Sequence, residues 1–94
     1  RKVDLDDLAI SKGIEFSELL DEIDAIVFSG TKINIDYFVN EVMDKEMIDE
    51  AFDYFKNHAE TDDIDAALNH LGENEYTREE VRLLRIKFLS EVGN

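Results

Sequence analysis

The sequence contains no cysteine and no proline, and only four of its 94 residues are glycine. Without thiols, the chain can form neither disulfide bonds nor thiolate metal sites. No apolar run approaches the roughly 20 residues that a membrane-spanning helix needs, and no signal-peptide pattern is present. The sequence therefore excludes a disulfide framework, and we expect a cytoplasmic protein that does not contact a membrane.

Basic residues are also scarce, because 10 Lys and Arg stand against 24 Asp and Glu, for a formal net charge of −14. Such a field repels phosphate backbones at long range. The charge is unevenly spread: residues 78–94 carry four basic and three acidic side chains, and the remainder carries six basic and 21 acidic ones. The C-terminal segment, at +1, is thus electrostatically distinct from the rest, at −15.

Apolar residues make up 44% of the chain, which is typical of a folded domain. They recur at helical spacing, most clearly in the segment 16–29 at Phe16, Leu19, Leu20, Ile23, Ile26 and Val27. Each glycine stands where such a pattern stops. We predict one all-α domain of five or six short helices over residues 1–94, with a helix-turn-helix at about 4–30 and a helical remainder at 34–94.

Residues suited to helix N-caps precede the predicted helices, at Asp4, Asn34, Asp44, Thr61 and Thr77. Thr77 is followed three residues later by Glu80, which makes a capping box. Two alternatives stay open. Residues 31–35 could form a short extended segment, and the third and fourth helices could run on as one, because no Gly or Pro separates them.

Residues that would carry catalysis are not grouped in the sequence. The four serines lie in no strained Gly-x-Ser-x-Gly turn, His58 and His70 are isolated, and no Gly-rich phosphate loop is present. The acidic runs at 4–7 and 62–65 lack the Gly and Glu of a calcium-binding loop. We therefore expect no catalytic, cofactor-binding or metal-binding residue, and no enzymatic activity, in this chain alone.

The aromatic and methionine residues recur at helical spacing and are expected in the core. Tyr37, Tyr54 and Tyr76 could instead reach the surface and stack on bases. Acidic neighbours at Asp36 and Asp53 weaken that hypothesis.

The sharpest local signal is a stripe of three arginines, Arg78, Arg82 and Arg85, in the last predicted helix. At 100° per residue they fall within an arc of about 60°, and guanidinium groups make bidentate contacts with phosphates. One interpretation is a small nucleic-acid contact, to which Lys12 and Lys32 beside the helix-turn-helix could add. The interpretation we favour is that the arginine stripe pairs with the protein's own acidic helices or with an acidic partner.

The second predicted helix carries four acidic residues and no basic one, at Glu18, Asp21, Glu22 and Asp24. In DNA-binding helix-turn-helix proteins this helix enters the major groove. Carboxylates cannot hold a polyanion there without cationic positioning contacts. We therefore expect the motif to be architectural and not a recognition helix.

Two longer segments carry a family resemblance. The run Leu8-Ala9, Gly13-Ile14, Glu18-Leu19-Leu20, Ile26, Ser29-Gly30 and Ile33-Asn34-Ile35-Asp36 resembles the helix-turn-helix domain near the C-terminus of many RecQ-type DNA helicases. SELLDEIDAIVFSGTKINIDYF (17–38) and EEVRLLRIKFLSEVGN (79–94) are similar to the extreme C-terminal region of bacterial RecQ helicases. The match is specific in these two runs and weak between residues 45 and 75.

The resemblance implies a parent enzyme, an ATP-dependent 3′-to-5′ DNA helicase of repair and recombination. Its motor domains, which use ATP and Mg, its zinc site and its winged helix would lie upstream. The chain begins with Arg-Lys and not with Met, as expected of a fragment. The predicted function is a non-catalytic C-terminal accessory domain that modulates DNA contacts or contacts with the parent's own motor domains or a basic protein. The alternatives are an acidic helical protein-interaction module without direct DNA contact, and a stand-alone regulator.

Overall fold

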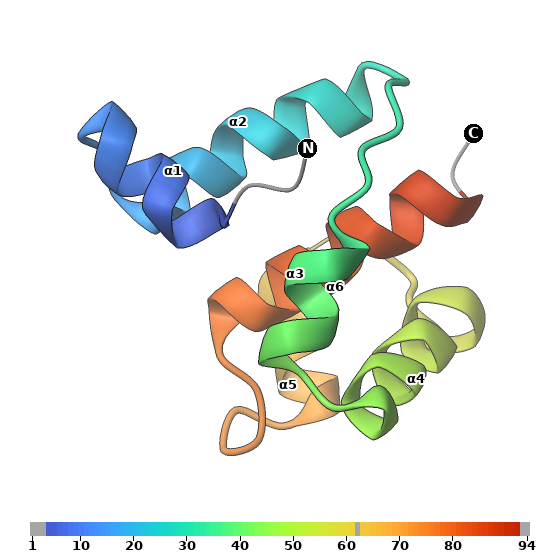
Figure 1. Ribbon diagram of the computed structural model, residues 1–94. Coiled ribbons are helices and arrows are strands. Elements are labelled where there is room, and N and C mark those ends of the chain that lie inside the picture. Colours follow the sequence, from blue (N-terminus) through green and yellow to red (C-terminus); the bar gives the residue numbers. More distant parts are fainter. Residues whose placement is uncertain (1–3, 62, 93–94) are drawn as a thin grey trace.

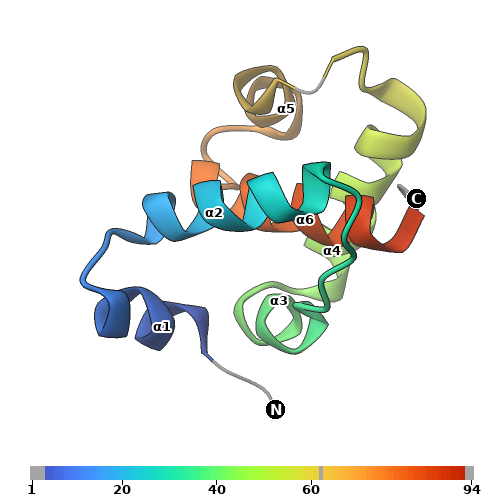
Figure 2. The same ribbon diagram turned by 90° about the horizontal axis from the view of Figure 1, so that it is seen from above.

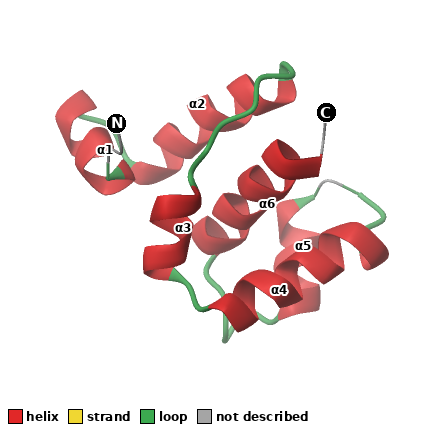
Figure 3. Cartoon of the chain, turned by 45° about the vertical axis from the view of Figure 1, so that its right-hand side comes forward, coloured by secondary structure: helices red, strands yellow, loops and turns green. Residues whose placement is uncertain are grey.

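The computed structural model describes residues 4–61 and 63–92, and its helices are arranged as shown in Figure 1. The helices are α1 (Leu5–Lys12), α2 (Phe16–Phe28), α3 (Asp36–Val42), α4 (Lys45–Asp53), α5 (Ile64–Leu71) and α6 (Arg78–Val92), and α4 continues into a π-helical turn, η1 (Tyr54–His58). No strand occurs among these residues (Figure 3). The all-α prediction is confirmed. Within the same residues, no helix is long and apolar enough to cross a bilayer.

The ends of α1 and the start of α6 form as the sequence predicts. The Asp4 carboxylate accepts a hydrogen bond from the Asp6 amide at 2.9 Å, and α1 ends at Gly13 in the left-handed conformation, with φ of 71°. A side chain at that φ would be strained, so glycine is required there. Before α6, the Glu80 amide donates to the Thr77 hydroxyl at 3.1 Å and the Thr77 amide donates to Glu80 at 2.8 Å. The predicted capping box is confirmed.

The connection from α2 to α4 decides the two alternatives that the sequence leaves open. Residues 31–35 are neither helix nor strand, and α3 begins at Asp36 with Ile35 at the N-cap position. The Asn34 side chain accepts from the Asp36 amide at 3.0 Å one residue before that position, so the predicted N-cap at Asn34 is wrong by one residue. Met43 has extended φ and ψ of −136° and 146°, which ends α3 before Asp44 starts α4. The third and fourth helices are therefore separate.

The predicted cap of the fifth helix is wrong by two residues. The carboxylate of Asp63 accepts from the Asp65 amide at 3.0 Å and caps α5. The Thr61 hydroxyl instead accepts from the Asp63 amide at 3.2 Å, which forms a turn before the helix. Both side chains are suited to capping a helix N-terminus. Asp63 caps α5 because it directly precedes the first residue of the helix.

Helix α6 lies at the centre of the fold, in contact with α2, α3, α4 and α5. Figure 2 shows α2 running along α6, with α1 and α3 on one side of this pair and α5 on the other. Because its neighbours surround it, α6 buries apolar side chains in several directions, at Val81, Leu83, Leu84 and Ile86. The buried apolar residues of α6 are therefore not confined to one side of the helix.

Two of the three tyrosines that could have reached bases are core residues. Tyr54 and Tyr76 are 5% and 3% exposed. The Tyr76 hydroxyl donates to Glu50 at 2.6 Å, and burial together with this hydrogen bond raises the pKa of Tyr76. The base-stacking hypothesis is wrong for both residues. Tyr37 is half-buried.

Candidate functional site

Two residues of the arginine stripe, Arg82 and Arg85, lie against α2, and Asp24 is the residue that joins the two helices. Asp24 lies on the inward face of α2, one turn from the buried Leu20 and Val27, and is 8% exposed. Its Oδ2 atom is 2.7 Å from Nη2 of Arg82 and 3.2 Å from Nη2 of Arg85. One largely buried carboxylate is thus shared by two guanidinium groups.

Arg82 has further acceptors on the same helix. Its Nη2 is 2.6 Å from Oδ1 of Asp21, and its Nη1 donates to the Ser17 carbonyl at 3.2 Å. Only 12% of its side chain is exposed. Burial alone would lower the pKa of Arg82, but the hydrogen bonds to Asp24 and Asp21 outweigh burial and raise it. The cation is therefore held in its charged form and directed at α2.

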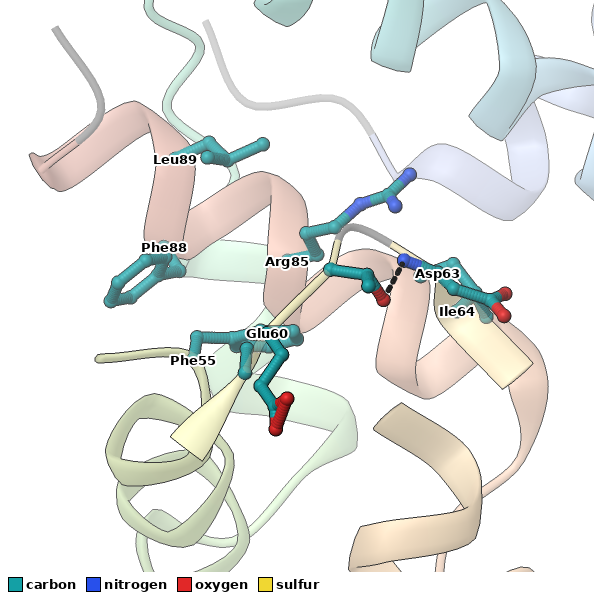
Figure 4. Close-up of a pocket in the computed structure, with 9 residues that line it drawn as sticks. Phe55, Glu60, Asp63, Ile64, Arg85, Phe88 and Leu89 are labelled. Atoms are coloured by element: carbon teal, nitrogen blue, oxygen red, sulfur yellow. Dashed lines mark hydrogen bonds between the residues drawn. The ribbon is translucent and has the colours of Figure 1, made fainter. Parts of the chain in front are cut away.

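Arg85 is held in a similar way. Its side chain is 11% exposed, and its guanidinium lies 5.2 Å from the ring centre of Phe28, in a cation–π contact. Its aliphatic part lines a pocket of about 240 Å³ between η1, the start of α5 and α6. Figure 4 shows that the guanidinium points away from Phe55 and Phe88 in that pocket.

The other predicted contact residues do not join this pair. Arg78 forms an ion pair with Asp65 of α5, and 53% of its side chain is exposed. Lys12 is 3.2 Å from Glu22, which ties α1 to α2. Lys32 is exposed and lines a pocket with Ser90 of α6. Ser90 lies twelve residues after Arg78, which is roughly 18 Å along the helix, so Lys32 lies at the opposite end of α6 from Arg78. The five predicted contact residues therefore form no single basic patch.

The exposed face of α2 is acidic. Asp21 and Glu22 have side chains 69% and 51% exposed, and Glu18 is exposed as well. The opposite face of α2 is buried against α6. If α2 entered a major groove, it would bring carboxylates toward the bases, which agrees with an architectural helix-turn-helix.

Sequence reasoning missed a second buried cation, Lys87. Its Nζ is 2.8 Å from Asp36 at the start of α3, contacts Glu91, and lies 5.5 Å from the ring centre of Phe52. Its side chain is 10% exposed. Burial alone would lower the pKa of Lys87, but hydrogen bonds to Asp36 and Glu91 raise it. The signal that could have found it is a charged residue flanked by Ile86 and Phe88 in an apolar segment.

The two histidines are not isolated. Their rings stack with centroids 5.6 Å apart, and Nε2 of His58 is 3.2 Å from Asp53. Across the described ranges, no three His, Cys, Asp or Glu side chains are close enough to hold a metal ion. The sequence contains no Gly-rich phosphate-binding loop.

The part of the chain that is similar to a known protein family is the helix-turn-helix. Residues 1–39 match the profile of the RecQ-1-like, helix-turn-helix domain. The resemblance inferred from the sequence is confirmed for this part, which comprises α1, α2 and the first four residues of α3. No curated protein matches the chain.

Proposed function

We propose that the chain is a non-catalytic accessory domain of a RecQ-like, ATP-dependent 3′-to-5′ DNA helicase of repair and recombination. The match of residues 1–39 to the RecQ-1-like helix-turn-helix domain carries this proposal. We propose further that the domain acts by binding protein, either the parent's basic motor-domain surfaces or a separate basic protein. Direct DNA contact through the arginine stripe is the weaker candidate.

The pairing of Arg82 and Arg85 supports protein over DNA. Freeing a buried cation from its partner costs about 3–5 kcal/mol, and each 1.4 kcal/mol is a factor of ten in affinity. A DNA phosphate that competed with Asp24 and Asp21 would therefore bind at least ~100-fold more weakly than it would to free arginines. The net charge of −14 adds long-range repulsion.

The remaining cations do not offset that disadvantage. Among the described residues, the other exposed cations are Arg78, Lys12, Lys32, Lys45 and Lys56. Three of them form ion pairs, Arg78 with Asp65, Lys12 with Glu22 and Lys45 with Asp49. Because phosphate contacts act together, cations at separate places on the surface give weak binding. An acidic surface, in contrast, attracts a basic protein through the same field that repels DNA.

The test is fluorescence anisotropy with a labelled 3′-tailed duplex, at low and at physiological salt. The wild-type chain should show no saturable binding. The variant Asp21→Asn/Asp24→Asn removes both carboxylate partners of Arg82 and should gain salt-sensitive binding. The matched control Glu46→Gln/Glu73→Gln changes the net charge equally at exposed positions and should gain little.

Two results would contradict the proposal. Tight, salt-sensitive DNA binding by the wild type that is lost in Arg82→Ala would assign the arginine stripe to DNA. The reading frame upstream of Arg1 tests the parent enzyme separately. Helicase motor motifs are expected there, and a Met codon directly before Arg1 would contradict the accessory-domain assignment.

A further inference from the structure

A groove lies where α1, α2, α3 and the first turns of α6 meet, on the side where Figure 2 shows α1 and α3. Its volume is about 160 Å³. It is lined by four apolar and three acidic residues, Phe16, Phe38, Val42, Leu83, Asp6, Glu79 and Glu80. We refer to these seven residues as the acidic groove.

The floor of the acidic groove is apolar and fixed. Phe38 and Leu83 are each 3% exposed, and the rings of Phe16 and Phe38 pack with centroids 6.2 Å apart. Val42 stands at the edge and is 45% exposed, although the spacing of apolar residues in α3 places it in the core. A cavity of roughly 150 Å³ accommodates a molecule of the size of benzene, so this groove has room for one apolar side chain.

The rim of the acidic groove carries net negative charge. The carboxylate of Glu80 accepts from the Thr77 amide, whereas the Asp6 and Glu79 carboxylates make no ion pair or hydrogen bond within residues 4–61 and 63–92. The N-termini of α1 and α6 lie beside them and contribute about +0.5 each. Three carboxylates and two helix ends leave a charge of about −2 around an apolar floor.

We propose that the acidic groove is the docking site for a basic protein segment that inserts one apolar side chain between flanking Lys or Arg residues. The apolar floor would take the anchor, and the rim would take the cations, which is the usual division between the core and the rim of an interface. A second copy of this chain fits less well, because two bodies of charge −14 repel each other. The inference rests on the proposed function in that it assigns a site to the basic partner.

The experiment compares two labelled probe peptides in anisotropy titrations with the whole 94-residue chain. The first has a leucine flanked by two lysines on each side, and the second has serine in place of leucine. The leucine peptide should bind at least five-fold more tightly than the serine peptide. In Val42→Ser this preference should fall to less than two-fold. The control Ile10→Ser, at a residue that is 76% exposed and outside the groove, should keep it.

Charge is tested with Glu79→Gln against the exposed control Glu73→Gln. Glu79→Gln should weaken binding of both peptides two- to five-fold at low salt, and Glu73→Gln should have a smaller effect. Amide shifts in nitrogen-15 spectra should concentrate at Val42, Leu83 and their neighbours in the sequence.

The possible failures are distinguishable. If both peptides bound equally and Val42→Ser changed neither affinity, the acidic groove would not be the docking site. The acidic surface would then attract basic proteins without an apolar anchor. No binding of either peptide at low salt would also remove protein attraction from the proposed function. Concentration-dependent dimers in sedimentation velocity that vanish in Val42→Ser would assign the groove to a second copy and overturn the proposal.

Discussion

Replacing Asp24 with Asn should destabilise the chain far more than the same change at Asp21. Both carboxylates contact Nη2 of Arg82, at 2.7 and 2.6 Å, but their side chains are 12% and 69% exposed. Removing one partner of a buried ion pair costs about 3–5 kcal/mol, because the other charge stays buried. Exposed pairs contribute about 0.2–1 kcal/mol.

The structure places the cost of Asp24→Asn just below the range for a fully buried pair. Arg82 keeps Asp21 and the Ser17 carbonyl after the change, which moderates the loss, whereas Arg85 loses Asp24. We expect a loss of about 2–3 kcal/mol in the free energy of unfolding for Asp24→Asn and below about 1 kcal/mol for Asp21→Asn. A domain of this size has roughly 5–14 kcal/mol in total, so both variants should still fold.

The assay is urea unfolding followed by circular dichroism at 222 nm, with the slope checked for two-state behaviour. Asp24→Asn should lower the midpoint by about 2 M. The triple variant Asp24→Leu/Arg82→Met/Arg85→Met removes all three charges and should recover most of the loss, because no unpaired ion remains. Equal midpoints for Asp24→Asn and Asp21→Asn would refute the reasoning, since they would mean that Asp24 is effectively in water.

Two further predictions concern pH and helix caps. The pKa values of Tyr76 and Lys87 are raised in the folded chain. The stability that these shifts contribute is complete below the pKa values of the unfolded chain, near pH 10, and is lost as the pH rises further. The urea midpoint should therefore stay constant from pH 7 to about 9 and then fall. Tyr76→Phe should make that fall shallower, and a flat profile to pH 11 would contradict the assignment. Thr77→Ala should lower the free energy of unfolding by about 1 kcal/mol, because the Thr77 hydroxyl caps α6. Thr61→Ala should lower it by less than half of that, because Asp63 and not Thr61 caps α5. Equal shifts of the thermal midpoint in the two variants would contradict the observed caps.

Both ends of α1 and the start of α6 could be predicted from the sequence, whereas the N-cap of α5 and the pairing of buried charges could not. Asp4, Gly13 and the Thr77–Glu80 capping box depend on neighbours in the chain, so sequence reasoning found them. The environment of Arg82 depends on residues about 60 positions away, which no local pattern encodes. The helical wheel places Arg78, Arg82 and Arg85 on one arc, but it cannot show which acidic residue each of them meets. Arg82 and Arg85 share Asp24, whereas Arg78 pairs with Asp65.

The central position of α6 explains why its charged side chains are buried. A helix with neighbours on one side buries one stripe, but α6 contacts four helices, so charges on its other sides are buried as well. For this reason Arg85 and Lys87 are each only 9% exposed when the whole residue is counted. An acidic residue on an otherwise apolar face, as Asp24 is on α2, was the available sign that a cation would meet it.

The ion pairs of α6 also bear on how far the helix-turn-helix can act by itself. Residues 1–39 contain Asp24 and Asp36, and their partners Arg82, Arg85 and Lys87 all lie in α6. Between these contacts α2 buries its apolar face, at Leu19, Leu20, Ile23 and Val27, and its closest packing is with α6. Without α6, that face and two carboxylates would lose their partners together. The stretch that matches the family is therefore one part of a fold that α6 completes, and the acidic groove is lined by residues of both.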